Sequence, residues 1–91
     1  MTHPEEIIRA VASLVDAKGR GVFTRNQVRK LIGVSSHDWL YRYTATFQGM
    51  RVDHPGGAPA VGARWKDVFQ RVSRGKYILT PRGRRLVSEL R

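Results

Sequence analysis

Residues 71–81, RVSRGKYILTP, constrain the fold of this 91-residue chain more than any other segment. They predict two short β-strands, at 67–72 and 77–79, joined by a basic, glycine-containing turn. Thr80 and Pro81 then suit the start of a helix, because threonine accepts a backbone hydrogen bond at an N-cap and proline needs no amide partner in the first turn. We therefore expect a hairpin that leads directly into a C-terminal helix.

Two helices with a short strand between them are predicted upstream. Over residues 4–17 the apolar side chains recur at helical spacing. Residues 22–23 can form only a short strand, and Thr24 with Gln27 then matches a capping box that begins the second helix. Gly33 is expected to end this helix. Its core-facing residues are expected to be Val28, Leu31 and Ile32.

A third helix is predicted from a cap at Ser35 or Ser36 to about Met50. Residues 52–63 are rich in proline and glycine, so we expect an exposed loop between this helix and the hairpin. The apolar face of the third helix is expected to consist of Trp39, Leu40, Tyr43, Phe47 and Met50.

The predicted order is helix, short strand, helix, helix, hairpin, helix. This is the order of a winged helix-turn-helix, an α+β fold with a three-helix core, a β-hairpin wing and a C-terminal helix. The length leaves room for one domain, residues 1–91.

The charge is strongly positive and unevenly placed. The chain has 17 Lys and Arg against 7 Asp and Glu, a formal net charge of +10. Residues 1–17 hold one base and three acids, so the excess of bases lies in the rest of the chain. Such a surface favours a polyanionic partner. The alternative is a basic protein whose charge serves only solubility.

Composition and motifs exclude several classes of function. The chain has no cysteine, which excludes disulfides, cysteine-type zinc fingers and thiol catalysis. His3, His37 and His54 lack the spacing of metal ligands, and the motifs of metalloproteases, P-loop proteins and serine hydrolases are missing. We therefore expect no enzymatic activity, cofactor or metal. No apolar run reaches the ~20 residues that span a bilayer, and the acidic N-terminus is unlike a secretion signal. We expect no membrane partner and a cytoplasmic, nucleoid-associated protein.

The outward face of the third helix is the candidate for reading DNA bases. Gln48 could pair with an adenine edge and Arg42 with guanine or a phosphate, while Thr44 and Ala45 are small enough to approach a methyl group. The alternative is the solvated face of an ordinary amphipathic helix. The base-reading candidates are His37, Tyr41, Arg42, Thr44, Ala45 and Gln48.

Basic residues elsewhere are candidates for contacts with the DNA backbone. Those of the wing turn are the strongest, and three arginines follow at the start of the last helix, where cations are unfavourable on helix-dipole grounds. The backbone candidates are Arg25, Arg29, Lys30, Arg51, Arg71, Arg74, Lys76, Arg82, Arg84 and Arg85.

Three short motifs connect the chain to a known family. They are GVFT at 21–24, TFQGMR at 46–51 and RGKY at 74–77. With them the chain resembles winged-helix DNA-binding domains, and more narrowly the winged helices attached to modification-dependent, methyladenine-type restriction endonucleases. The resemblance implies recognition of N6-methyladenine in double-stranded DNA and partnership with a nuclease domain or subunit. The loop at 54–62 looks longer than the corresponding link in that family.

Three other functions remain open at the level of sequence. A winged-helix transcriptional regulator would use the same surfaces on unmodified DNA. An RNA-binding or ribosome-associated protein could use the same basic surface on A-form or single-stranded RNA. A protein-interaction module could dock another subunit on the face of the third helix.

Overall fold

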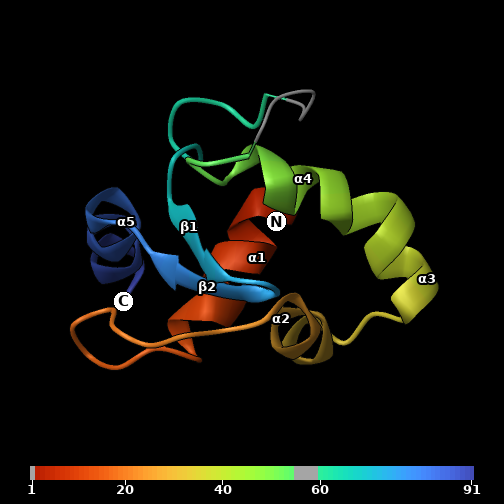
Figure 1. The fold of residues 1–91 in the computed structure, drawn as a ribbon, viewed down its shortest axis with the longest axis horizontal. Helices are drawn as coiled ribbons and strands as arrows, with labels where there is room; N and C mark the ends of the chain where they lie inside the picture. The colour runs from red at the N-terminus through yellow and green to blue at the C-terminus, as the bar shows by residue number, and fades with distance from the viewer. Residues whose placement is uncertain (1, 55–59) are drawn as a thin grey trace.

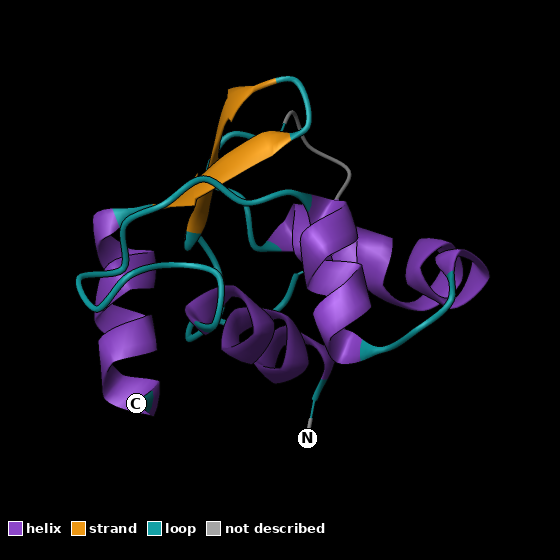
Figure 2. Cartoon of the chain, turned by 90° about the horizontal axis from the view of Figure 1, so that it is seen from below, coloured by secondary structure: helices purple, strands orange, loops and turns teal. Residues whose placement is uncertain are grey.

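Helices form the body of the structure, and one antiparallel β-hairpin stands against them (Figures 1 and 2). The computed structural model describes residues 2–54 and 60–91. Residues 55–59, part of the expected loop at 52–63, lie outside the described residues. In chain order the elements are α1 (His3–Ala12), α2 (Arg25–Ile32), α3 (Ser36–Asp38), η1 (Trp39–Tyr43), α4 (Thr44–Gly49), β1 (Phe69–Ser73), β2 (Lys76–Leu79) and α5 (Pro81–Leu90).

The hairpin separates two helical regions. In Figure 1 it lies between α5 on one side and the α3–η1–α4 helix on the other, and Figure 2 shows the same separation from below. Residues 36–49 form one continuous rod from α3 through η1 to α4, which we call the middle helix. The arrangement is thus an α+β domain in which a two-stranded hairpin is followed by a C-terminal helix. Within the described residues, no helix is both long and apolar enough to cross a membrane.

The core joins α1, α2, η1, α4, the hairpin and α5 through large apolar side chains. Helix α1 contributes Ile7, Ile8 and Val11, all fully buried. Aromatic rings connect the middle helix to the hairpin: Phe47 stacks on Phe69 with ring centroids 4.9 Å apart. The expected short strand at 22–23 is a single antiparallel bridge, in which Phe23 and Tyr77 exchange both backbone hydrogen bonds at 2.9 Å. The core residues outside α1 are Phe23, Val28, Trp39, Tyr43, Phe47, Met50, Val68, Phe69, Tyr77, Leu79, Leu86 and Val87.

The predicted helix caps are confirmed. Thr24 and Gln27 form both hydrogen bonds of a capping box at the start of α2. Gly33 ends that helix in the left-handed conformation, with φ of 86°. Ser35, not Ser36, caps α3, and Thr80 caps α5 by accepting the amide of the third residue of the helix. Local hydrogen-bonding chemistry therefore defines these element starts.

The first helix is shorter than predicted. It ends at Ala12 rather than at residue 17. Asp16 stabilises a turn instead, because its Oδ1 atom accepts the amides of Lys18 and Arg20, each at 2.9 Å. Aspartate side chains compete in this way with helical hydrogen bonds and favour turns. The hydrogen bond from the Arg20 amide, and to a smaller extent that from the Lys18 amide, holds the pKa of Asp16 below its usual range.

The third helix contains a π-helical turn that its sequence pattern does not reveal. On a regular α-helix, side chains four residues apart differ by about 40° in direction around the helix axis. The wider turn of η1 compensates for this angular difference. Trp39 and Tyr43 consequently stack in parallel, 5.7 Å between ring centroids. The core prediction for Leu40, which lies within this turn, is wrong, because its side chain is 60% exposed. The core prediction for Leu31 on α2 is also wrong, because that side chain is 52% exposed.

The hairpin has the predicted strands with small shifts and one irregularity. Phe69 pairs with Leu79, and a β-bulge interrupts the register between Arg71 and Ser73. Beyond β2, helix α5 approaches the polypeptide that enters β1 very closely. A Cβ atom at Gly83 would lie 2.2 Å from the carbonyl oxygen of Val68, so only glycine fits there.

Candidate nucleic-acid interface

The outward face of the middle helix presents most of the predicted base-reading residues. The rings of His37 and Tyr41 contact each other at 4.5 Å between centroids, and Tyr41 is 72% exposed. Arg42 and Ala45 are also exposed. Thr44 and Gln48 are half-buried, so only part of each side chain can contact a partner. The six candidates thus share one helix but differ in accessibility.

A surface cavity connects the middle helix with α2 and the hairpin turn. Its volume is about 540 Å³, and its lining includes Arg25 and Asn26 of α2, Leu40 and Thr44 of the middle helix, and Gly75 of the turn. The Thr44 hydroxyl donates to the Trp39 carbonyl at 3.1 Å and so bridges the ends of the π-helical turn. Leu40 adds an exposed apolar side chain to the lining, to which α2 contributes polar residues.

Leu40 and Asn26 are cavity residues that sequence reasoning missed. Leu40 follows the apolar spacing of the core, yet its side chain lies at the surface of the π-helical turn. Asn26 carries no motif of its own. Its side-chain oxygen accepts two hydrogen bonds from Arg29, at 3.1 and 3.0 Å.

The turn of the hairpin presents its cations to solvent. Gly75 has φ of 75°, a conformation that glycine adopts without strain, and it lets the two strands reverse tightly. Arg74 and Lys76 on either side of it are exposed. Among residues 2–54 and 60–91, no hydrogen bond or ion pair engages the side chains of these two residues. They are therefore available for an anionic partner.

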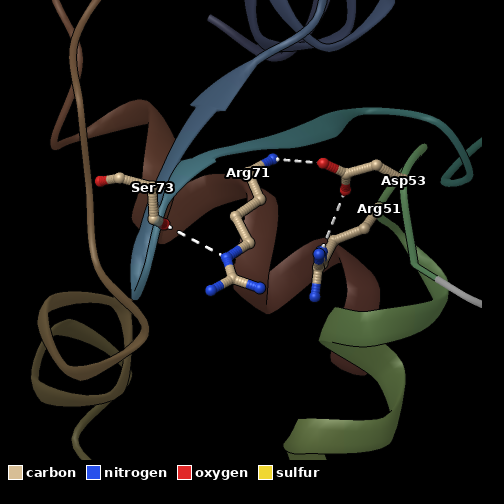
Figure 3. Close-up of polar contacts among 4 residues, drawn as sticks. All are labelled: Arg51, Asp53, Arg71 and Ser73. Carbon is tan, nitrogen blue, oxygen red and sulfur yellow. Dashed lines mark hydrogen bonds and ion pairs between the residues drawn. The ribbon is translucent and has the colours of Figure 1, made fainter.

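At the other end of β1, Asp53 connects two of the predicted backbone-contacting arginines (Figure 3). Its Oδ1 atom pairs with Nε of Arg51 at 3.2 Å, and its Oδ2 atom accepts the backbone amide of Arg71 at 2.9 Å. Arg51 also lies over the Tyr77 ring, 5.2 Å from its centroid, and only 11% of its side chain is exposed. Arg71 is exposed and donates from Nε to the Ser73 carbonyl at 3.3 Å.

The basic residues of α2 differ in exposure and in the hydrogen bonds that their side chains form within the protein. Arg29 is half-buried and donates to the Val34 carbonyl at 2.9 Å as well as to Asn26, so it stabilises the end of α2. Lys30 is exposed, and Arg25 lies at the cavity described above. Arg25 and Arg29 both line this cavity beside the middle helix and the hairpin turn.

The three arginines of α5 lie apart from this region. In Figure 1, α5 is on the far side of the hairpin from α3. Arg82 donates to the backbone carbonyls of Lys66, at 3.1 Å, and Ala63. Arg84 donates to the Leu79 carbonyl at 3.2 Å and packs against Gly19. Arg85 is exposed. The structure thus does not bring these residues together with the hairpin turn.

No group of three His, Asp or Glu side chains in residues 2–54 and 60–91 is placed to hold a metal ion. The pKa of Tyr43 is raised because its hydroxyl donates to the Glu6 carboxylate at 2.5 Å and is largely buried. This pair joins the middle helix to α1, away from the cavity. No protein-family model, curated protein or solved structure matches this chain.

Proposed function

We propose that this chain is a winged helix-turn-helix module that binds double-stranded DNA. In this proposal the middle helix reads base edges in the major groove, and the hairpin is the wing, which contacts phosphates. Three elements meeting at one cavity, through Arg25, Thr44 and Gly75, are the observation that carries the proposal. A duplex that touches the middle helix there would also meet α2 and the wing turn.

The charge distribution supports a phosphate-binding role for the wing. Arg74 and Lys76 are exposed on either side of the turn, and the chain carries a net charge of +10. Each neutralised phosphate releases counterions, so binding that depends on these residues should weaken steeply as salt rises.

Base readout is assigned to the outward residues of the middle helix. Gln48 and Arg42 offer the donor and acceptor groups that adenine and guanine edges require. Leu40 and the Thr44 methyl group add apolar surface that suits a methyl group in the major groove. We extend the proposal on this basis to recognition of N6-methyladenine, with a nuclease domain or subunit as the partner that would act on the bound DNA.

A fluorescence titration tests the proposal. Labelled duplexes containing unmethylated or N6-methylated GATC, and a single-stranded RNA of the same length, are titrated at two salt concentrations. Tighter binding to the duplexes than to RNA, with steep salt dependence, supports DNA binding. Preference for the methylated duplex at both salt concentrations supports modified-base reading. Equal duplex affinities would contradict modified-base reading alone, and stronger RNA binding would contradict the whole proposal.

A further inference from the structure

Asp53 holds the end of the middle helix and the first strand of the hairpin through one carboxylate. One oxygen is bound to Arg51, two residues beyond the end of α4, and the other to the backbone amide of Arg71 on β1. The Val52 amide also donates to the Phe69 carbonyl at 2.8 Å, which brings the two segments together. The carboxylate therefore adds a side-chain connection to the backbone hydrogen bonds that hold β1 beside the end of the middle helix.

The same carboxylate contacts both Arg51, through its side chain, and Arg71, through its backbone amide. Figure 3 shows the Arg51 and Arg71 side chains on the same side of the Asp53 carboxylate, with their terminal nitrogens directed away from it. Asp53 binds Arg51 only at Nε, and Arg71 uses its Nε for the Ser73 carbonyl. Within residues 2–54 and 60–91, no hydrogen bond engages the terminal nitrogens of either group, so these donors can serve another acceptor. Paired guanidinium donors match the oxygens of a phosphate.

We propose that Asp53 is a positioning residue that holds Arg51 and Arg71 as a single site for one phosphate of the DNA backbone. This inference rests on the proposed DNA binding. In this site Arg51 is fixed between Asp53 and the Tyr77 ring, and Arg71 is the exposed donor. The carboxylate does not touch the phosphate. It orients the two cations.

The proposal predicts a change in DNA affinity opposite to the one that net charge alone predicts. Asp53→Asn removes a negative charge, which by itself should strengthen binding to DNA. If Asp53 positions the arginines, affinity should instead fall about tenfold, since the charge-assisted bond to Arg51 is lost. Glu89→Gln is the matched control, because it removes the same charge from an exposed site on α5. This control should bind as tightly as the wild type or more tightly.

A double-mutant cycle keeps the test independent of small changes in folding. Arg71→Ala retains the backbone amide that Asp53 accepts, so the fold should persist while the salt slope falls by about 1. Arg71→Ala and Asp53→Asn should be non-additive, because both disturb one site. Arg74→Ala and Asp53→Asn should be additive. Thermal unfolding of each variant verifies that the folded protein is being titrated.

The outcomes separate this inference from the proposed function. Weaker binding of Asp53→Asn than of Glu89→Gln, with coupling to Arg71 but not to Arg74, supports the shared phosphate site. Asp53→Asn binding as tightly as Glu89→Gln, in a protein that still binds duplex DNA, overturns the inference and leaves the proposed function standing. Wild-type protein that binds no duplex overturns both.

Discussion

The hairpin turn and the start of α5 look alike in sequence and differ in structure. Each region carries closely spaced cations and a glycine: Arg74 and Lys76 around Gly75, and Arg82 and Arg84 around Gly83. At the turn both cations are exposed, and the glycine has open space around it. On α5 both arginines donate to backbone carbonyls, and the glycine contacts the chain that enters β1.

The difference shows why charge density alone does not locate a binding surface. A guanidinium that satisfies carbonyls of its own chain stabilises the fold, and moving it to a phosphate would leave those carbonyls unpaired. Arginines at a helix start are unfavourable for the helix dipole, and at Arg82 and Arg84 the bonds to carbonyls supply the compensating contact. The sequence predicts DNA-backbone contacts for both regions, because it reveals the positive charges but not the backbone carbonyls that accept their hydrogen bonds.

The largest effect is expected from the two glycines. Alanine within a helix is normally more stable than glycine by about 1 kcal/mol. At Gly83, however, the new Cβ would lie 2.2 Å from the Val68 carbonyl, so Gly83→Ala should destabilise the fold by about 3 kcal/mol. Gly75→Ala meets open space and should cost only about 1 kcal/mol for its positive φ. Urea unfolding of both variants measures the difference. Equal stabilities of the two variants would contradict the difference between the two glycine sites.

Gln48 tests the middle helix, which lies on the opposite side of the hairpin from α5. If its amide reads an adenine edge, Gln48→Ala should lose about 1.5 kcal/mol of discrimination between the preferred duplex and a random duplex. Competition titrations with the two duplexes measure this. Equal loss of affinity for both would contradict base reading by this residue.

Substitution of one arginine in each region compares the hairpin turn with the start of α5 directly. Arg74→Ala should weaken binding to all duplexes alike and lower the salt slope by about 1, with unfolding unchanged. Arg84→Ala should cost about 1 kcal/mol of stability, because it removes the bond to the Leu79 carbonyl, and should leave the salt slope unchanged. Salt-dependent titration and thermal unfolding of both variants give the two readouts. Interchanged results would reverse the assignment of the two regions.

The smallest effect concerns a contact distant from both regions. Because the Tyr43–Glu6 hydrogen bond raises the pKa of Tyr43, the stability it supplies is present below about pH 10 and is lost as pH rises through the raised pKa. Tyr43→Phe should therefore be less stable than the wild type at about pH 8, by about 1 kcal/mol. The two proteins should converge at more alkaline pH. A difference that does not change with pH would contradict this assignment.

Much of the fold follows from local patterns. The capping box at Thr24 and Gln27, the left-handed Gly33 and the start of the last helix at Thr80 are each encoded within a few residues, and all are confirmed. The hairpin follows from alternation around one glycine. These features are predictable because the interactions that define them are short in sequence.

The remaining features depend on contacts between distant residues. The π-helical turn, on which Trp39 and Tyr43 stack and Leu40 is exposed, is not revealed by apolar spacing alone. Asp53 has its role only because β1 lies beside it, 18 residues away in sequence. In the same way, the structural use of Arg82 depends on carbonyls 16 and 19 residues distant. The sequence therefore predicts a candidate site, but it does not separate the arginines that donate to backbone carbonyls from those that are exposed.

A titration followed by ¹⁵N–¹H correlation spectra is the most direct test of the division between the two basic regions. The protein is titrated with duplex DNA at low salt, and the shifts of backbone amides are mapped along the chain. The account predicts that the largest changes fall at residues 37–45 and 74–76, while residues 82–85 stay near their starting positions. Changes centred on residues 82–85, with the hairpin turn unaffected, would contradict it.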